Sequence, residues 1–295
     1  MYRPDSRGQM PSPLGDTERM VAAMYETFYQ MMHTPFVRDT PVQDLYESPA
    51  MADALGRLAY AADRQLFAVV TADAGCGKST LIRRFVTTLS QEEYLFLYLS
   101  DSKLTPRWFY KGLLDQLGIE SKFYRGDAKR QLQKEVEIIR GVQKKKVVCI
   151  LDEAHLLEKE TIEEFRFLLN YKFDSMSPMA LVLVGQTELW DKLRMQRYAA
   201  VRQRIDINCV LPHLDRAETE RYIVSHLAYA GGKQEIFTDK AIDDIYKEST
   251  GIPRSINRIC EKSLMYASQQ NKRLIDEHLV HYIIEHELLG GDVHQ

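Results

Sequence analysis

The chain has 295 residues, of which 45% are hydrophobic and 27% are charged, a balance that is ordinary for a globular protein. This length allows one sizeable core and a second, smaller one. The formal net charge of -3 gives no overall positive field, so any surface for nucleic acid has to be local. Four scattered cysteines, no apolar run near the ~20 residues of a membrane span and no hydrophobic signal core predict a cytoplasmic protein with no membrane partner.

The N-terminal region is expected to begin with a flexible tail. Residues 1–16 place prolines and glycines among polar residues. From Thr17 the spacing predicts a helix that packs into the core through one face, formed by Met20, Met24, Phe28 and either Met31 or Met32. A second helix is expected around residues 50–62.

The most informative stretch follows the apolar run 66–70, where a glycine-containing loop leads into a helical pattern. Gly75 and Gly77 allow backbone N–H groups to turn inward around a phosphate, and Lys78 and Ser79 are placed to contact phosphate and Mg²⁺. The usual motif, G-x-x-x-x-G-K-[ST], starts with glycine, whereas this chain has Ala72 there. The predicted ATP-binding residues are Ala74, Gly75, Cys76, Gly77, Lys78, Ser79 and Thr80.

A second motif completes the predicted nucleotide site. The apolar run 147–151 ends in Asp152-Glu153, about 70 residues after the phosphate loop, a spacing that favours one shared sheet edge. Asp152 is a candidate Mg²⁺ ligand, and Glu153 is a candidate base for a water that attacks the γ-phosphate. His155 either caps the next helix, which we favour, or senses the γ-phosphate.

Helices alternate with short apolar runs, which predicts a doubly wound parallel α/β sheet. Further strands are expected at 94–99 and 180–184, with a fifth starting near Arg202 and Arg204; intervening helices are expected at 106–118, from 127 and at 159–173. Gln186 ends a strand that should lie between the two motif strands, either as a sensor orienting the attacking water or as a turn residue.

After Leu214 the pattern is helical throughout, with an expected capping box at Asp215 and Glu218 and further caps at Thr238 and Asp276. Arg254 begins a helix after Gly251 and is placed to face the γ-phosphate. The expected domains are a tail at 1–16, an α/β nucleotide-binding domain at 17–212 and a helical lid at 213–295.

Together these motifs resemble those of the AAA+ ATPases over residues 25–290. The resemblance implies an ATPase that uses ATP and Mg²⁺. It implies that Lys78 and Ser79 bind phosphate and Mg²⁺, Asp152 binds Mg²⁺ and Glu153 activates water. It further implies that Gln186 is sensor 1, that Arg254 is sensor 2, and that Arg204, or alternatively Arg202, reaches the nucleotide of a neighbouring subunit.

More narrowly, Phe28-Tyr29-Gln30, Pro35-Phe36 and the run from Leu183 to Leu189 resemble the ExeA-type branch, which includes secretion-assembly ATPases and helper ATPases of DNA transposition similar to TnsC, MuB and IstB. Secretion members typically continue past the lid into a membrane span, whereas this chain ends there, which favours the helpers.

The resemblance implies an ATP-dependent protein that forms a ring or filament on double-stranded DNA and recruits a transposase. Phosphate contacts would dominate that binding. The candidate contacts are Lys103, Arg107, Lys111, Arg125, Lys129 and Arg130. The alternatives are a secretion-type assembly ATPase and an ATP-gated scaffold with little hydrolysis.

Overall fold

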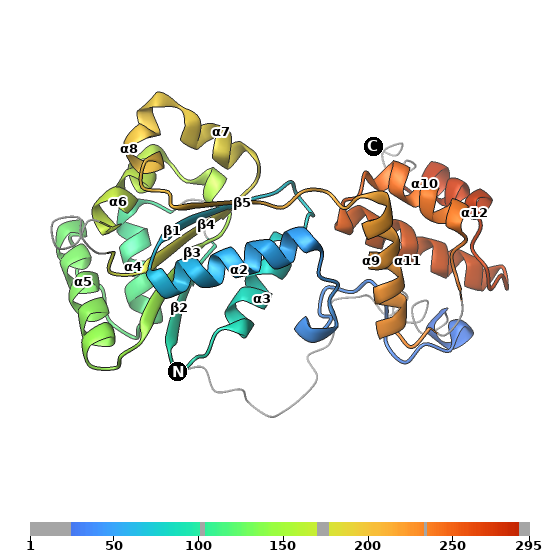
Figure 1. Cartoon of the computed structure of the whole chain (residues 1–295), viewed down its shortest axis with the longest axis horizontal. Coiled ribbons are helices and arrows are strands. Elements are labelled where there is room, and N and C mark those ends of the chain that lie inside the picture. The colour runs from blue at the N-terminus through green and yellow to red at the C-terminus, as the bar shows by residue number, and fades with distance from the viewer. Residues whose placement is uncertain (1–24, 101–103, 170–176, 233–234, 289–295) are drawn as a thin grey trace. The chain divides into compact units, whose positions relative to one another are not determined.

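The computed structural model describes residues 25–100, 104–169, 177–232 and 235–288 (Figure 1). They divide into two compact units. The sheet unit comprises Pro41–Leu214 and Ile252–Arg254. The helical unit comprises the described residues up to Thr40 together with those of Asp215–Gly251 and from Ser255 onward.

The sheet unit is built on five parallel strands in the order β2-β3-β4-β1-β5. The strands are β1 (Phe67–Thr71), β2 (Tyr94–Leu99), β3 (Lys146–Leu151), β4 (Ala180–Gly185) and β5 (Ile207–Val210). Every residue of β1 and β4 is buried, as expected for central strands covered on both faces. The predicted parallel α/β sheet is therefore confirmed, including the position of β4 between the two strands that carry the motifs.

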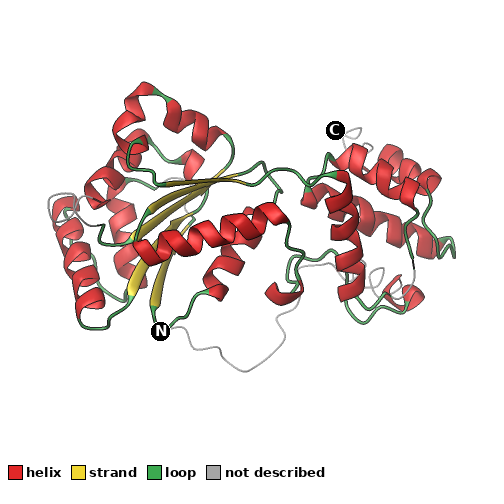
Figure 2. Ribbon diagram, viewed as in Figure 1, coloured by secondary structure: helices red, strands yellow, loops and turns green. Residues whose placement is uncertain are grey.

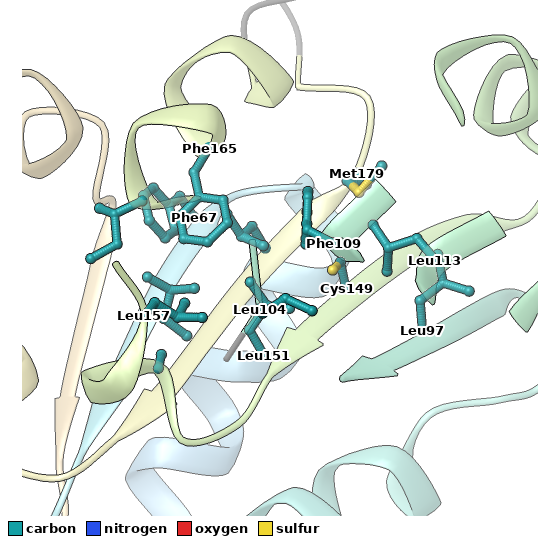
Figure 3. Close-up of a cluster of buried hydrophobic side chains, with 14 of the residues drawn as sticks. Phe67, Leu97, Leu104, Phe109, Leu113, Cys149, Leu151, Leu157, Phe165 and Met179 are labelled. Atoms are coloured by element: carbon teal, nitrogen blue, oxygen red, sulfur yellow. The ribbon is translucent and has the colours of Figure 1, made fainter. Parts of the chain in front are cut away.

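Helices cover both faces of this sheet (Figure 2). On one face, α2 (Pro49–Arg64) and α3 (Lys78–Thr88) pack on alternate strand residues such as Val70 and Val184. The opposite face is covered by α4 (Pro106–Gln116), α5 (Arg125–Gly141), α6 (Lys159–Leu169), α7 (Glu188–Arg194) and α8 (Ala199–Arg202). Figure 3 shows the core under this second group of helices. In it, Phe109 and Phe165 are packed edge to face, with their ring centroids 5.6 Å apart.

The helical unit contains α9 (Arg216–Tyr229), α10 (Asp239–Ser249), α12 (Glu277–Ile283) and most of α11 (Pro253–Gln269). The predicted capping box is present, since the Asp215 side chain accepts from the backbone of Glu218 and the Glu218 side chain accepts from the backbone of Asp215. Thr238 and Asp276 cap α10 and α12 as predicted. Short turns lie at η1 (Val42–Asp44), η2 (Ala154–Leu156), η3 (Gln196–Tyr198) and η4 (Ile284–Leu288).

The segment 25–40 packs with the helical unit, whereas the sequence placed it in the α/β domain. Its helix ends before Gln30, whose φ of +56° turns the chain. The backbone of Met32 then donates to the Ala230 carbonyl at 2.7 Å, and the Met32 side chain is 77% exposed. Of the two alternatives for the packed face, Met32 is therefore excluded and the partly buried Met31 is retained; Met20 and Met24 lie outside the described residues.

Two helix and strand boundaries also differ from the expectation. The strand β5 begins at Ile207, so Arg202 is the last residue of the short helix α8 and Arg204 lies in the turn before the strand. The helix α5 begins at Arg125, two residues before the predicted start at Asp127. In both places the irregular segment between elements had no periodic pattern to read.

Candidate nucleotide-binding site

The phosphate loop connects the end of β1 to the start of α3. Gly75 and Gly77 have φ values of +88° and +90°, a backbone conformation that residues other than glycine rarely adopt. Gly77 is the N-cap of α3, so the unpaired N–H groups of the first helical turn open onto this loop. The loop therefore has the backbone geometry of an anion-binding site at a helix N-terminus.

Lys78 begins α3 and turns its side chain back over the loop. Its ammonium donates to the carbonyl oxygens of Ala72 at 2.8 Å and Asp73 at 3.0 Å, and the residue is only 9% exposed. Burial lowers the pKa of Lys78, and the carboxylates of Glu153 and Asp152 act in the opposite direction. The loop thus holds a cation next to the two acidic residues of the second motif.

Asp152 follows β3, and both of its carboxylate oxygens accept hydrogen bonds. Oδ2 accepts from the Tyr98 hydroxyl of β2 at 2.8 Å, and Oδ1 accepts from the Glu153 backbone at 2.8 Å. Burial, together with the hydrogen bond to Asp152, raises the pKa of Tyr98, so this phenol remains a donor at neutral pH. Tyr98 was not predicted as a site residue, since a tyrosine in an apolar strand gives no local signal of its partner.

Glu153 and His155 lie next to each other in the turn after β3. Glu153 has a φ of +52°, and its side chain is 44% exposed. The Nδ1 atom of His155 lies 3.5 Å from Glu153 Oε2 and accepts from the Gln186 backbone at 3.4 Å. His155 therefore links the candidate base to the end of β4, and the prediction that it caps the next helix is wrong, because its ring bonds across the sheet edge instead.

Asp73 joins the phosphate loop to two other segments that are distant in sequence, contacts that no local pattern predicts. Its carboxylate accepts from the Thr187 hydroxyl, directly after Gln186, and its Oδ2 lies 2.8 Å from His213 Nε2, just past β5. The hydrogen bond from Thr187, and next to it that of His213, lower the pKa of Asp73 below its usual range. One carboxylate thus connects the exits of β1, β4 and β5.

The backbone of Arg254 lies beside the phosphate loop, and its side chain is exposed. Its backbone N–H donates to the Gly75 carbonyl at 3.3 Å. A Cβ added at Gly75 would come within 2.9 Å of the Arg254 Cβ and 3.1 Å of the Ile252 side chain. The absence of a side chain at Gly75 is therefore what permits this close approach.

The two candidate finger arginines differ in their surroundings. The guanidinium of Arg202 donates to the carbonyl oxygens of Leu193 and Arg194 at the C-terminal end of α7. Arg204 lies in the following turn and is partly exposed. Arg202 therefore satisfies carbonyls of its own subunit, a structural task that the sequence spacing could not distinguish from a role in a neighbour's site.

The donor set fits ATP with Mg²⁺. Ser79 is exposed in the first turn of α3, and Asp152 supplies a carboxylate at the end of β3. Among the described residues no group of three histidine, cysteine or acidic side chains is gathered to hold a metal. Mg²⁺ held through one carboxylate, a hydroxyl, waters and nucleotide phosphates needs no such group.

Comparison with known proteins identifies the fold. A family model described as AAA domain matches residues 61–193. The Cdc6p structure from Pyrobaculum aerophilum superposes with a TM-score of 0.62 at 15% identity, covering 81% of this chain and 67% of that one. The Drosophila ORC structure bound to DNA gives a TM-score of 0.63 at 15% identity, covering 97% of this chain and 71% of that one. The chain therefore has the fold of the AAA+ P-loop NTPases, and the matched AAA domain, which includes the phosphate loop and Asp152-Glu153, supports nucleotide hydrolysis.

Within this class, the chain is similar to General secretion pathway protein A of Aeromonas hydrophila. The two are 31% identical over 251 residues, which is 83% of this chain and 45% of that protein. The chain thus spans less than half the length of this relative. No helix in the described part of the chain combines the length and apolarity required to cross a membrane.

Proposed function

We propose that the protein is an ATP-controlled assembly ATPase of the ExeA type, whose subunits associate around bound ATP and separate after hydrolysis. The observation that carries this proposal is the convergence of the phosphate loop, Asp152-Glu153 and Gln186 at the carboxyl edge of β1, β3 and β4, with β4 in the middle. The similarity to the Aeromonas secretion protein favours this branch over others.

The site residues divide the chemistry among them. Lys78 and the loop amides bind the phosphates, while Ser79 and Asp152 hold Mg²⁺, which neutralises charge on the phosphates when bound. Glu153 takes the proton of the attacking water, and Gln186 orients that water. His155, between them, fixes the distance from the base to the end of β4. Arg254 contacts the γ-phosphate from beside Gly75.

Arg204 is the finger that completes the site of a neighbouring subunit. This assignment follows the family resemblance, and Arg202, which donates to two carbonyl oxygens at the end of its own α7, is the alternative finger. A cation supplied in trans makes hydrolysis depend on assembly, which is the behaviour expected of an ATP-dependent switch.

A mixing experiment tests this arrangement. Arg204→Ala and Lys78→Ala should each abolish turnover, whereas equal amounts of the two should regain part of it at interfaces that pair an intact finger with an intact phosphate loop. As a comparison, the Arg202→Ala and Lys78→Ala variants are mixed in the same proportions. A lack of rescue by Arg204→Ala, with both variants folded and still oligomeric, argues against a finger in trans.

A second candidate function is the ATP-dependent helper of DNA transposition, in which the assembly forms on duplex DNA and recruits a transposase. The observation that favours it is an exposed guanidinium, that of Arg107, at the start of α4 beside exposed aromatic rings. The Drosophila ORC structure, which shares the fold, is described as bound to DNA. The single relative above 30% identity that we report, the secretion protein, favours the first candidate instead.

The six candidate DNA contacts are not equally available. Lys111 pairs with Asp115 at 2.5 Å, Arg125 with Glu164 at 3.1 Å and Arg130 with Asp127 at 2.6 Å. Lys129 is partly buried, and burial lowers its pKa. Lys103 lies outside the described residues. Arg107, exposed and stacked on a ring, is therefore the strongest of the six candidates.

The two candidate functions are separated by the ATPase rate with and without duplex DNA across a salt series. A stimulation that declines as salt rises supports the DNA-dependent helper, because released counterions drive phosphate contacts. A rate that does not respond to DNA while assembly still requires ATP supports the secretion-type ATPase, whose partner is then a protein.

A further inference from the structure

Three large aromatic side chains lie exposed together at the start of α4 and before α5. Trp108 is 54% exposed, Phe123 is 68% exposed and Tyr124 is 71% exposed. The opposite side of α4 buries Phe109 and Leu113 completely, so the helix already contributes its apolar side to the core. We call the exposed group, with Arg107 and Lys111, the ring–cation surface.

Each part of this surface pairs a cation with a ring. The Arg107 guanidinium lies 4.3 Å from the centre of the Phe123 ring, and the Lys111 ammonium lies 5.7 Å from the centre of Trp108. The rings of Phe123 and Tyr124 meet edge to face at 5.3 Å. Contacts between rings and cations hold exposed aromatic side chains in place without burying them.

A role in packing the core does not account for these three aromatic rings, because they are exposed to solvent. Exposed aromatic rings lose the free energy that burial would give, and contiguous ones mark binding sites. In the described part of the chain Arg107 makes no ion pair, its recorded contact being the Phe123 ring. The surface therefore offers positive charge and flat apolar faces at the same place.

We propose that the ring–cation surface binds nucleic acid through unpaired bases, with Arg107 contacting phosphate and the three rings stacking on bases. Alternating cations and rings match an unpaired strand, whose phosphates repeat along a backbone and whose base faces are accessible. This inference rests on the second candidate function, binding of DNA, and specifies which form of DNA is preferred.

Tryptophan fluorescence reports stacking directly. The chain has two tryptophans, so Trp190→Phe leaves Trp108 as the only one. With ATP present, an unpaired oligonucleotide, or a duplex with an unpaired central segment, should quench and shift the emission of Trp108. A fully paired duplex of equal length should change it much less, and inorganic polyphosphate, which has charge without bases, should not change it.

Affinity measured by fluorescence anisotropy separates rings from charge. Phe123→Ala and Tyr124→Ala should each weaken binding of the unpaired oligonucleotide by about tenfold, the size of one stacking contact, with a smaller effect on the paired duplex. Tyr60→Ala is the matched control, because Tyr60 is 55% exposed on α2 with the Arg64 guanidinium 5.9 Å from its ring centre. This control should bind both forms as the unchanged chain does.

The outcomes distinguish this inference from the function on which it rests. Equal affinity of the ring variants and the control for unpaired DNA overturns the inference while leaving DNA binding intact. Absence of any nucleic-acid binding by an active, ATP-assembled protein overturns both. Loss of ATP-dependent self-association by Phe123→Ala, with DNA affinity unchanged, assigns the surface to a second copy of the chain and also overturns the inference.

Discussion

Tyr98 is the residue on which the orientation of the candidate magnesium ligand depends. Its hydroxyl is one of two donors to the Asp152 carboxylate, so Tyr98→Phe removes half of the hydrogen bonding recorded for that side chain. We predict that the Mg²⁺ concentration giving half-maximal ATPase activity rises about tenfold, the size found when a ligand loses an outer partner. A magnesium titration of turnover, and of fluorescent ATP binding, measures this.

Tyr60→Phe, which removes an exposed hydroxyl far from this carboxylate in sequence, should leave the magnesium titration unchanged. Equal or tighter magnesium dependence in Tyr98→Phe would show that the hydroxyl competes with the metal instead of orienting its ligand.

Glu153→Gln removes the candidate base and keeps its size. Turnover should fall by about 10²-fold or more, the contribution of a positioned general base, while ATP binding and ATP-dependent assembly persist. Single-turnover hydrolysis and equilibrium binding of a fluorescent ATP analogue give the two quantities separately. Normal turnover in this variant would exclude Glu153 as the base.

The sequence identified site residues by motif but did not predict the contacts that connect them. Lys78 and Asp152 carry a spacing pattern that nucleotide chemistry imposes on neighbouring residues. Tyr98, His155 and Asp73 act through partners that are distant in sequence, such as Asp152, Gln186 and His213. Such pairs depend on strand order and register, which no local pattern encodes.

His226 gives the helix α9 an unusual pH dependence. It is 3% exposed, its ring stacks on Phe36 and lies tilted against Tyr222, and no described residue bonds to either ring nitrogen. Burial lowers the pKa of His226 to about 4, from 6.5. The unfolded chain therefore takes up this proton first as pH falls, and the folded state loses stability between pH 6.5 and 4.

We predict that His226→Phe removes this part of the acid sensitivity. Between pH 7 and pH 4 the unchanged chain should lose about 3 kcal/mol more free energy of unfolding than the variant, the energy equivalent of the pKa difference. At pH 7 the variant should be as stable or more stable, because it replaces unpaired buried nitrogens by apolar atoms. Urea unfolding at each pH measures both effects, and parallel curves for the two proteins would contradict the prediction.

Among whole elements, the central strands and capped helices were predictable because each has a strong local signal. Unbroken apolar runs gave β1, β3 and β4, and cap residues gave α9, α10 and α12. The segment 25–40 was assigned to the wrong neighbours, since its hydrogen bond to the Ala230 carbonyl joins positions about 200 residues apart. The start of β5 was predicted too early, because the preceding helix α8 has only four residues and is too short to show a helical pattern.

The division into a sheet unit and a helical unit predicts two thermal unfolding transitions. ATP with Mg²⁺ at about 100 times its Kd should stabilise the sheet unit by about 2.7 kcal/mol, raising its Tm by roughly 5–10 °C. The Tm of the helical unit should rise less. Differential scanning calorimetry tests this, with Lys78→Ala as the variant that should show no shift; one transition moving as a whole would contradict it.

The pairing of β1 has a consequence for synthesis of the chain. Phe67 pairs with Leu181 and Ala68 pairs with Ile207, so the strand that positions the phosphate loop gains its neighbours only after β4 and β5 have left the ribosome. At ordinary translation rates this delay lasts roughly 7–30 s. Throughout that interval the nascent chain carries an unpaired apolar strand and no complete nucleotide site, so ATP stabilises the chain only after β5 has been synthesised.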